Sequence, residues 1–283
     1  MRKPRSKRSV NRKSPQRKSG KRGIPLGWVI GFVILLGLCF SVYHYRTVLA
    51  YYFSFKSKHS LSTSASKVEE AHVFQVLSRH PHYVFGFDVS EYQGDIAWEK
   101  VSTVADTFQL HFVFIRATAG KDKVDARFKT NWASARKQKF IRGAYHYYRP
   151  NENSILQAQN FIRQVALEKG DLPPVLDIEN LPKVQSMDSL KVGLKRWLTT
   201  VEAHYGIKPI IYSGESYYTD FLAKEFKGYP FWIANYNFFV ESPKENWLFW
   251  QFSEKGSVSG IQGLVDINLF QGTPKMLHYQ LKH

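Results

Sequence analysis

Apolar and polar positions follow two patterns from about residue 83 to the end of the chain. Short apolar runs predict eight strands, at 83–89, 112–118, 141–147, 174–178, 209–212, 231–234, 248–252 and 265–269. Longer segments between the earlier strands carry apolar residues at helical spacing and predict five helices, at 98–104, 126–139, 154–169, 189–205 and 216–226. Helices become short or absent after residue 231.

This alternation predicts the α/β fold class. Apolar strands that alternate with helices indicate a parallel sheet whose two faces are buried. Eight such strands favour a closed, irregular TIM-like (β/α)5(β)3 barrel, with the irregularity in its C-terminal part. An open doubly wound sheet is the alternative. Since no G-x-G-x-x-G motif follows the first strand, a dinucleotide-binding fold has no positive support.

A continuous apolar segment precedes the barrel pattern. Residues 23–45 contain no Asp, Glu, Lys or Arg, and about twenty apolar residues at ~1.5 Å each cross a hydrocarbon core of ~30 Å. Trp28 and Tyr43 lie near its ends, where interfacial aromatics are common. We therefore predict a single transmembrane helix at 24–45. A cleaved signal peptide is the alternative, but the following residues lack an A-x-A-like site.

The charges are distributed unevenly and set the expected topology. The net charge is +17, and residues 1–22 contain eleven Lys or Arg and no acid. Positive residues before a membrane helix predict a cytoplasmic N-terminus and a periplasmic or extracellular C-terminal part. Nucleic-acid binding by the basic residues is the weaker alternative. The expected organisation is a basic tail at 1–23, the transmembrane helix at 24–45, a juxtamembrane stalk or linker at 46–82, a barrel at 83–273 and a C-terminal tail at 274–283.

Residue usage excludes several kinds of chemistry. Cys39 is the single cysteine, so no intrachain disulfide and no site of paired cysteines can form. The absence of an H-x-x-x-H pair gives little support to metal binding, and the absence of G-x-S-x-G gives little to a serine nucleophile. Aromatic residues reach 16%, enough to fill a core or to line a groove for flat ligands such as sugar rings.

Carboxylates recur at the carboxyl ends of the predicted strands, where α/β barrels place their functional groups. Asp88 ends the first strand, Asp177 and Glu179 end the fourth, and Asp266 lies on the last. Residues i and i+2 of a strand point the same way, roughly 6–7 Å apart, so one acid of the Asp177–Glu179 pair should have a raised pKa. Glycoside hydrolysis requires one protonated acid and one group that stabilises positive charge. The alternative is that these acids only cap turns or lie exposed in loops.

Other polar and aromatic residues at the strand ends are candidates for substrate binding. An aromatic ring there could stack on a sugar, although it could equally pack in the core. His146 could act as a base, but a structural role within its strand is preferred. The substrate-binding candidates are Tyr145, Tyr147, Tyr212, Trp232, Trp250 and Gln251.

Eight stretches around these residues resemble glycoside hydrolase family 25, the Chalaropsis-type lysozymes. They cover nearly all of 83–271 in the expected order and include GFDVSEYQGDIAW, FVFIRATAG, RGAYHYYRP, PPVLDIEN, IIYSG, FWIANYN, WQFS and VDINLF. The resemblance implies an irregular barrel of eight strands and five helices. It also implies hydrolysis of the β-1,4 bond from N-acetylmuramic acid to N-acetylglucosamine in peptidoglycan.

The resemblance also implies the roles of the four acids. By motif position, Glu179 corresponds to the general acid, Asp177 to the first acid of the pair, and Asp88 and Asp266 to the other two acids of the site. The expected partner is the glycan strand of peptidoglycan, and we expect a monomer without a cofactor, a metal or a nucleic acid. A non-catalytic glycan-binding barrel and a glycosidase for another N-acetylglucosamine polymer are the alternatives.

Overall fold

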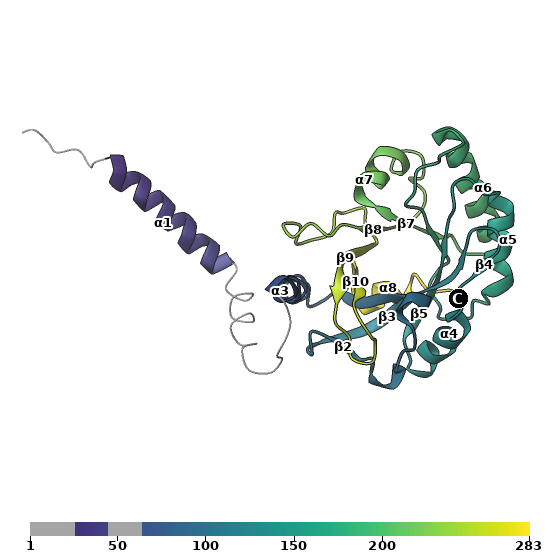
Figure 1. Cartoon of the computed structure of the whole chain (residues 1–283), viewed down its shortest axis with the longest axis horizontal. Helices are drawn as coiled ribbons and strands as arrows, with labels where there is room; N and C mark the ends of the chain where they lie inside the picture. The colour runs from purple at the N-terminus through teal and green to yellow at the C-terminus, as the bar shows by residue number, and fades with distance from the viewer. Residues whose placement is uncertain (1–25, 45–63) are drawn as a thin grey trace, which may run out of the picture. The chain divides into compact units, whose positions relative to one another are not determined.

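The structure is a computed structural model that describes residues 26–44 and 64–283, with side chains described for 27–43 and 68–283. The chain forms two compact units, Met1–Arg46 and Thr47–His283 (Figure 1). The predicted basic tail at 1–23 and residues 46–63 of the predicted stalk lie outside the described residues.

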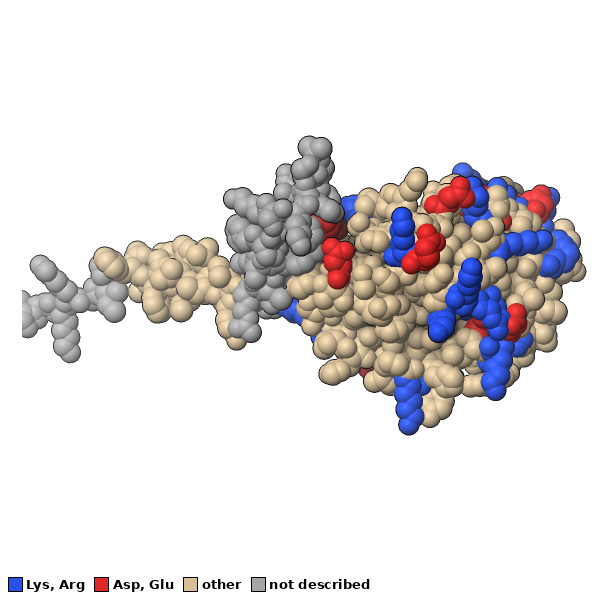
Figure 2. Space-filling view, turned by 90° about the horizontal axis from the view of Figure 1, so that it is seen from below, with Lys and Arg blue, Asp and Glu red and all other residues tan. Residues whose placement is uncertain are grey.

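The N-terminal unit contains the helix α1 (Leu26–His44). It carries no Lys, Arg, Asp or Glu (Figure 2) and exposes its apolar side chains, with Trp28 76% and Phe40 68% exposed. In the described ranges, no helix has the length and apolar character that crossing a membrane requires. The transmembrane prediction at 24–45 is therefore not supported by the described helices, and it extends beyond the described side chains of α1 at both ends.

The second unit is built on a closed barrel of eight strands, as the apolar runs predicted. The chain order is β1, β3, β5, β6, β7, β8, β9 and β10, and β1 pairs with both β3 and β10 to close the barrel. The strand bounds are β1 (Val84–Val89), β3 (Phe108–Ala119), β5 (Ile141–Tyr147), β6 (Val175–Asp177), β7 (Ile210–Gly214), β8 (Phe231–Ala234), β9 (Phe249–Gly256) and β10 (Val265–Phe270).

The pairing is parallel from β1 through β9, but β10 runs antiparallel to both β9 and β1. A parallel connection needs a crossover of about a dozen residues or more. Only residues 257–264 join β9 to β10, so the chain turns back. The prediction of a fully parallel sheet is wrong for this strand.

Helices cover the outside of the barrel (Figure 1). They are α4 (Phe128–Lys137), α5 (Ser154–Gln164) and α6 (Met187–Tyr205). Asn153 caps the start of α5, because its side chain accepts hydrogen bonds from the backbone N–H groups of residues 155 and 156. Gly206 ends α6 with a φ of 70°, a left-handed conformation that glycine adopts without strain.

Two predicted helices take other forms. The segment 98–104 is the 3-10 turn η3 (Trp98–Lys100) followed by the short strand β2 (Thr103–Val104), which pairs with β3. The segment 216–226 begins with the short helix α7 (Glu215–Tyr217) and continues as the π-helical turn η4 (Tyr218–Leu222). The remaining short elements are η2 (Glu91–Gln93) and β4 (Lys123–Val124).

Part of the predicted stalk belongs to the folded unit. The helix α3 (Ser64–Arg79) packs on the barrel and buries Val73, Val76 and Leu77. The stalk interpretation of 46–82 is therefore wrong for α3, whose apolar face is covered.

The C-terminal tail prediction is likewise corrected. The helix α8 (Pro274–His278) places Leu277 in the core inside the barrel, and Leu281 joins it there. The backbone of Lys282 forms hydrogen bonds with Gly170 and Asp171 at 2.9 and 2.8 Å. Residues 274–282 are thus a packed part of the barrel.

The close approach of β1 and β3 generates a stability prediction. A Cβ atom on Gly86 would lie 2.5 Å from both the ring and the backbone oxygen of Phe112. We expect Gly86→Ala to lower the free energy of unfolding by about 1–3 kcal/mol through overpacking. Gly214→Ala is the matched control, since no atom lies within 4 Å of its added Cβ and its φ is −67°. Equal melting temperatures for the two variants in thermal unfolding would contradict this account of the β1–β3 contact.

Candidate active site

Inward-facing side chains change from apolar to polar toward one end of the barrel. Along β1 they run from Val84 to Asp88, and along β6 from Val175 to Asp177. The same change occurs on β3, where Arg116 follows the inward-facing Phe112 and Phe114. Since these strands are parallel, their carboxyl ends meet at one rim.

A cavity of about 210 Å³ lies at this rim. It is lined by all four predicted acids and by two of the predicted binding residues, Tyr145 and Tyr147. The other residues that line it are Val89, Ser90, Tyr92, Gln93 and Arg116.

Asp88 is held by two amide side chains. Gln251 Nε2 and Asn268 Nδ2 each donate a hydrogen bond of 2.7 Å to Asp88 Oδ2. Asn268 is oriented by Trp232, whose Nε1 donates to Asn268 Oδ1 at 2.8 Å. Gln251 Oε1 accepts from the Tyr212 hydroxyl at 2.6 Å. These bonds fix the position of the Asp88 carboxyl. The residue is buried, with 6% of its surface exposed.

Asp88 and Asp266 are opposite each other on β1 and β10. Burial, and then the negative charge of Asp266, raise the pKa of Asp88 well above its ordinary value. Burial raises the pKa of Asp266 to about 6, against the opposing effect of its hydrogen bond with Asp88. Two carboxyls that are joined by a hydrogen bond can share one proton.

Asp177 and Glu179 face the same side because the chain stays extended beyond β6. The N–H of Ile178 donates to the Tyr212 carbonyl at 3.0 Å, and the Ser213 hydroxyl donates to the Ile178 carbonyl at 2.6 Å. Ile178 is fully buried in the outer core. Its two neighbours therefore point into the cavity.

Asp177 is a buried acid with an unsatisfied oxygen. It is 5% exposed, and within the described residues its Oδ1 has no hydrogen-bond partner. Burial raises the pKa of Asp177 well above its ordinary value, and the charges of Glu179 and Asp88 raise it further, while Arg116 opposes them. The oxygen is available to accept a hydrogen bond from a ligand in the cavity.

Glu179 lies at the mouth of the same cavity. The residue as a whole is exposed, but its carboxyl is partly enclosed, and this desolvation raises its pKa. A hydrogen bond from the Tyr212 hydroxyl acts in the opposite direction. Because a phenol carries one proton, Tyr212 can donate either to Glu179 or to Gln251, but not to both at once.

Arg116 lies at a predicted strand end but was not among the predicted catalytic or binding residues. Its Nε lies 2.9 Å from Asp125 Oδ2, and a terminal nitrogen lies 3.1 Å from Glu91 Oε1. Its guanidinium carbon lies 4.6 Å from the ring centroid of Tyr92, which is 82% exposed. Arg116 therefore presents a fixed positive charge to the cavity. Asn268, two residues after Asp266 on β10, also lies at a predicted strand end and was not among the predicted site residues, although its i+2 spacing from Asp266 places both on the same face.

Two predicted binding residues are not accessible to a ligand. Trp232 is 2% exposed, stacks on Phe114 with ring centroids 4.4 Å apart, and donates a hydrogen bond to Asn268. Trp250 is fully buried in the outer core, and its Nε1 donates to the carbonyl of Asn235. The prediction that these two rings stack on sugar is therefore corrected, because packing covers both of them.

His146 has the structural role that was preferred for it. It is fully buried, 2.7 Å from the Thr118 hydroxyl and 3.1 Å from Gln157 Oε1. Burial lowers the pKa of His146 to about 3. Its ring stacks on Trp197 of α6, with centroids 5.5 Å apart, so it lies on the outer side of β5.

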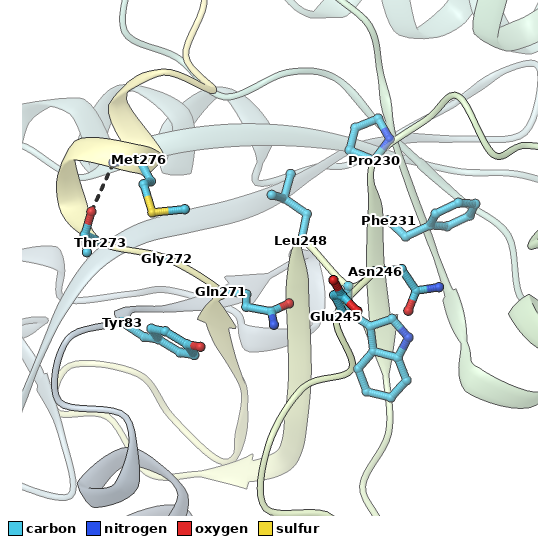
Figure 3. A pocket seen from close by; sticks show the side chains of 11 residues that line it. Tyr83, Pro230, Phe231, Glu245, Asn246, Leu248, Gln271, Gly272, Thr273 and Met276 are labelled. Carbon is cyan, nitrogen blue, oxygen red and sulfur yellow. Dashed lines mark hydrogen bonds between the residues drawn. The ribbon is translucent and has the colours of Figure 1, made fainter.

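A larger cavity, of about 560 Å³, lies at the opposite end of the barrel, where β8 and β9 begin and β10 ends (Figure 3). Its lining includes Tyr83, Leu248 and Met276 but none of the predicted site residues. Size alone does not identify a site, and the smaller cavity contains the titratable groups. Across 27–43 and 68–283, no group of three or more His, Cys, Asp or Glu has the arrangement of a metal site.

Comparisons with known proteins agree with this geometry. A family model described as glycosyl hydrolases family 25 matches residues 87–261. The chain is 41% identical over 198 residues to an uncharacterized Escherichia coli protein, YegX, covering 69% of this chain and 72% of that protein. It is 33% identical over 213 residues to Lysozyme M1 of Streptomyces globisporus, covering 69% and 70%. The structure of a bacterial lysozyme from Streptomyces coelicolor matches with a TM-score of 0.63 at 30% identity, covering 70% of this chain and 97% of that one.

Because the pKa of Asp177 is raised, replacing its carboxyl by a neutral group is expected to stabilise the fold, by an amount that depends on pH. Between the ordinary pKa of ~3.9 and the raised value, the folded state keeps a proton that the unfolded state has lost. A rise in pH therefore destabilises the fold. We expect Asp177→Asn to raise the free energy of unfolding by about 0.5–2 kcal/mol near pH 8, with the gain vanishing below about pH 4.

Thermal unfolding of Asp177→Asn across this pH range measures the effect. Asp188→Asn is the control, since the Asp188 side chain is 94% exposed and surface changes alter stability by about 0.5 kcal/mol or less. A gain that is independent of pH would contradict the raised pKa.

Proposed function

Because the chain belongs to glycosyl hydrolases family 25, we propose that the cavity of four acids hydrolyses the β-1,4 bond between N-acetylmuramic acid and N-acetylglucosamine in peptidoglycan. The protein is a glycosidase of the lysozyme type. The observation that carries the assignment is the Asp177–Ile178–Glu179 segment, which directs two acids of different environments into one cavity.

Glu179 is the general acid in this proposal. A general acid must hold its proton until the leaving oxygen arrives, and partial desolvation raises the pKa of Glu179 in that direction. Its position at the mouth lets it reach a glycosidic oxygen of a bound strand. The Tyr212 hydroxyl can then donate to the carboxylate that forms, so that the product state of Glu179 is stabilised.

Asp177 supports the positive charge that develops at the anomeric carbon. Its unsatisfied Oδ1 can accept a hydrogen bond from the N–H of the substrate's 2-acetamido group and orient that group for internal attack. Alternatively, the carboxylate stabilises an oxocarbenium-like transition state directly. Arg116, which lowers the pKa of Asp177, keeps this acid closer to its charged form than burial alone would.

Asp88 and Asp266 form the third component of the site. Their shared proton makes the cavity less negative than four separate carboxylates would. The two amide donors fix Asp88, so the pair offers hydrogen-bonding groups at set positions on the wall opposite Glu179. We propose that this pair orients a sugar ring of the substrate.

Removal of the proposed acid gives a direct test. Glu179→Gln is expected to slow the release of reducing ends from purified peptidoglycan by about 10²–10⁴-fold, as for loss of a general acid. The melting temperature should not fall, because Glu179 lies exposed at the rim. Glu99→Gln, at an exposed position of η3, is the matched control and should keep full activity.

Mass analysis of the products separates the alternative functions. N-acetylmuramic acid at the new reducing ends identifies the proposed bond. Products from chitin oligomers but not from peptidoglycan would indicate another N-acetylglucosamine polymer. Tight glycan binding by the wild-type protein without any new reducing end would contradict an enzymatic function, and retained activity in Glu179→Gln would remove this residue from the role of acid.

A membrane location is a further part of the proposal. Its support is the uncharged sequence at 24–45, the eleven basic residues before it, and the exposure of apolar side chains on α1. With a cytoplasmic N-terminus, the barrel would lie in the periplasm or outside the cell. There it would meet peptidoglycan.

Charged substitutions test the anchor. Val33→Arg combined with Leu36→Arg adds about 2.5–3.5 kcal/mol of insertion free energy per charge. We expect the wild-type protein in the membrane fraction after carbonate extraction and this variant outside it. The pair Val33→Leu and Leu36→Val keeps the apolar character and should behave like wild type. Recovery of the wild-type protein in the carbonate supernatant would contradict the anchor.

A further inference from the structure

The loop that joins β8 to β9, residues 235–248, leaves the barrel at the end that carries the acids. Figure 1 shows α3 lying beside β9, on the side toward which this loop extends. On α3, the His72 ring lies with its centroid 4.8 Å from that of Phe238 in the loop. The helix before the barrel therefore packs against a loop of the active-site end.

Glu241 is the centre of the polar contacts between α3 and the loop. Its carboxylate accepts hydrogen bonds from Gln75 Nε2 and from the Arg79 guanidinium. Its backbone oxygen accepts from His80 Nε2 at 2.8 Å, and the Ser242 hydroxyl lies 3.3 Å from the same nitrogen. The Glu241 side chain is 17% exposed, so these charge-assisted bonds are partly shielded from water.

A compact turn connects Glu241 to the site. The backbone N–H of Asn237 donates to Asn235 Oδ1 at 2.8 Å, and that of Phe239 donates to Asn237 Oδ1 at 3.0 Å. The N–H of Val240 donates to the Asn237 carbonyl at 2.9 Å. Side chains that bond their own backbone in this way stiffen a turn. A shift of Glu241 would therefore be transmitted to Tyr236.

Tyr236 links the β8–β9 loop to the acids through Gln251. Its hydroxyl donates to Gln251 Oε1, and Gln251 donates through Nε2 to Asp88. The residue is 43% exposed, so its ring lies at the rim while its hydroxyl is fixed. Tyr236 was not among the candidates from the sequence, because it falls in the loop beyond β8 and not on a strand end.

We propose that Glu241 is a positioning residue for Tyr236. By binding α3, Glu241 holds the β8–β9 loop so that Tyr236 stays against Gln251, next to the bound glycan. The helix α3 is in this way part of the substrate-binding machinery and not only a cover for the barrel. This inference rests on the proposed function, and it adds the segment before the barrel to the determinants of that function.

Kinetics on soluble, uncrosslinked glycan strands test the inference in the full-length protein. Glu241→Ala is expected to raise KM about fivefold, the effect of a lost hydrogen bond on substrate binding, with kcat changed by about twofold at most. Tyr236→Phe should raise KM to a similar extent. The double variant should be no worse than Tyr236→Phe alone, because Glu241 acts through Tyr236.

Glu245→Ala is the matched control, since it removes the same charge from the same loop but lies at the larger cavity at the other end of the barrel. It should keep the wild-type KM. If Glu241→Ala does not fold, Glu241→Gln replaces it in the single and double variants. Because Gln keeps an oxygen acceptor, the expected rise in KM is smaller. The proposal would be overturned if the rise in KM of the double variant equalled the product of the rises in the two single variants. A wild-type KM in Glu241→Ala would overturn it as well.

Hydrogen exchange separates failure of this inference from failure of the proposed function. The amides of residues 237–240 should exchange faster in Glu241→Ala than in Glu245→Ala, whether or not the substrate is correctly identified. Unchanged exchange overturns the positioning role. A wild-type protein that releases no reducing ends overturns the proposed function and leaves the exchange result standing.

Discussion

The period of two along the barrel strands is the constraint on which the site depends. Successive side chains of a strand face opposite sides, so each strand contributes one set of residues to the barrel interior and the other to the contact with the helices. Along β6 and the extended residue after it, Val175 and Asp177 face inward, whereas Leu176 and Ile178 pack in the outer core. A slip of one residue would bury Asp177 under the helices. The apolar packing of the outer layer thus holds the acids in place.

The buried acids differ in the hydrogen bonds that the protein donates to them. Asp88 receives two amide donors, one of them oriented by the buried Trp232. Asp177, equally buried, has an oxygen for which the described chain supplies no donor. An unsatisfied buried acceptor is unfavourable for the fold, and in the proposed function a substrate N–H supplies the missing donor. The protein therefore fixes one acid itself and leaves the other to the ligand.

The strands and the acids could be predicted from the sequence because both depend on local pattern. Apolar runs located β5 and β8 with their observed bounds, and the i, i+2 spacing placed Asp177 and Glu179 together. The alternation of side chains along a strand also shows that Trp250 and Gln251, which are adjacent, cannot both face inward. Trp232 does face inward, but its neighbours Phe114 and Tyr212 cover it. That burial and the contact of Tyr236 with Gln251 depend on tertiary contacts, which no local pattern encodes, whereas the reversal of β10 follows from its short connection to β9.

The segments on either side of the barrel have different physical roles, although both resemble linkers in sequence. Residues after β10 close the interior at the end away from the acids, where Leu277 and Leu281 complete the apolar core. The helix before β1 packs against the side of the barrel and binds a loop of the acidic rim. Burial inside the barrel raises the pKa values of Asp88 and Asp177, and the apolar side chains of the inner core lie on the side of the barrel away from the acids. Contact of α3 with the β8–β9 loop lies at the end of the barrel that carries the acids. Chain outside the strands therefore completes the inner core at one end and contacts a loop of the active-site end.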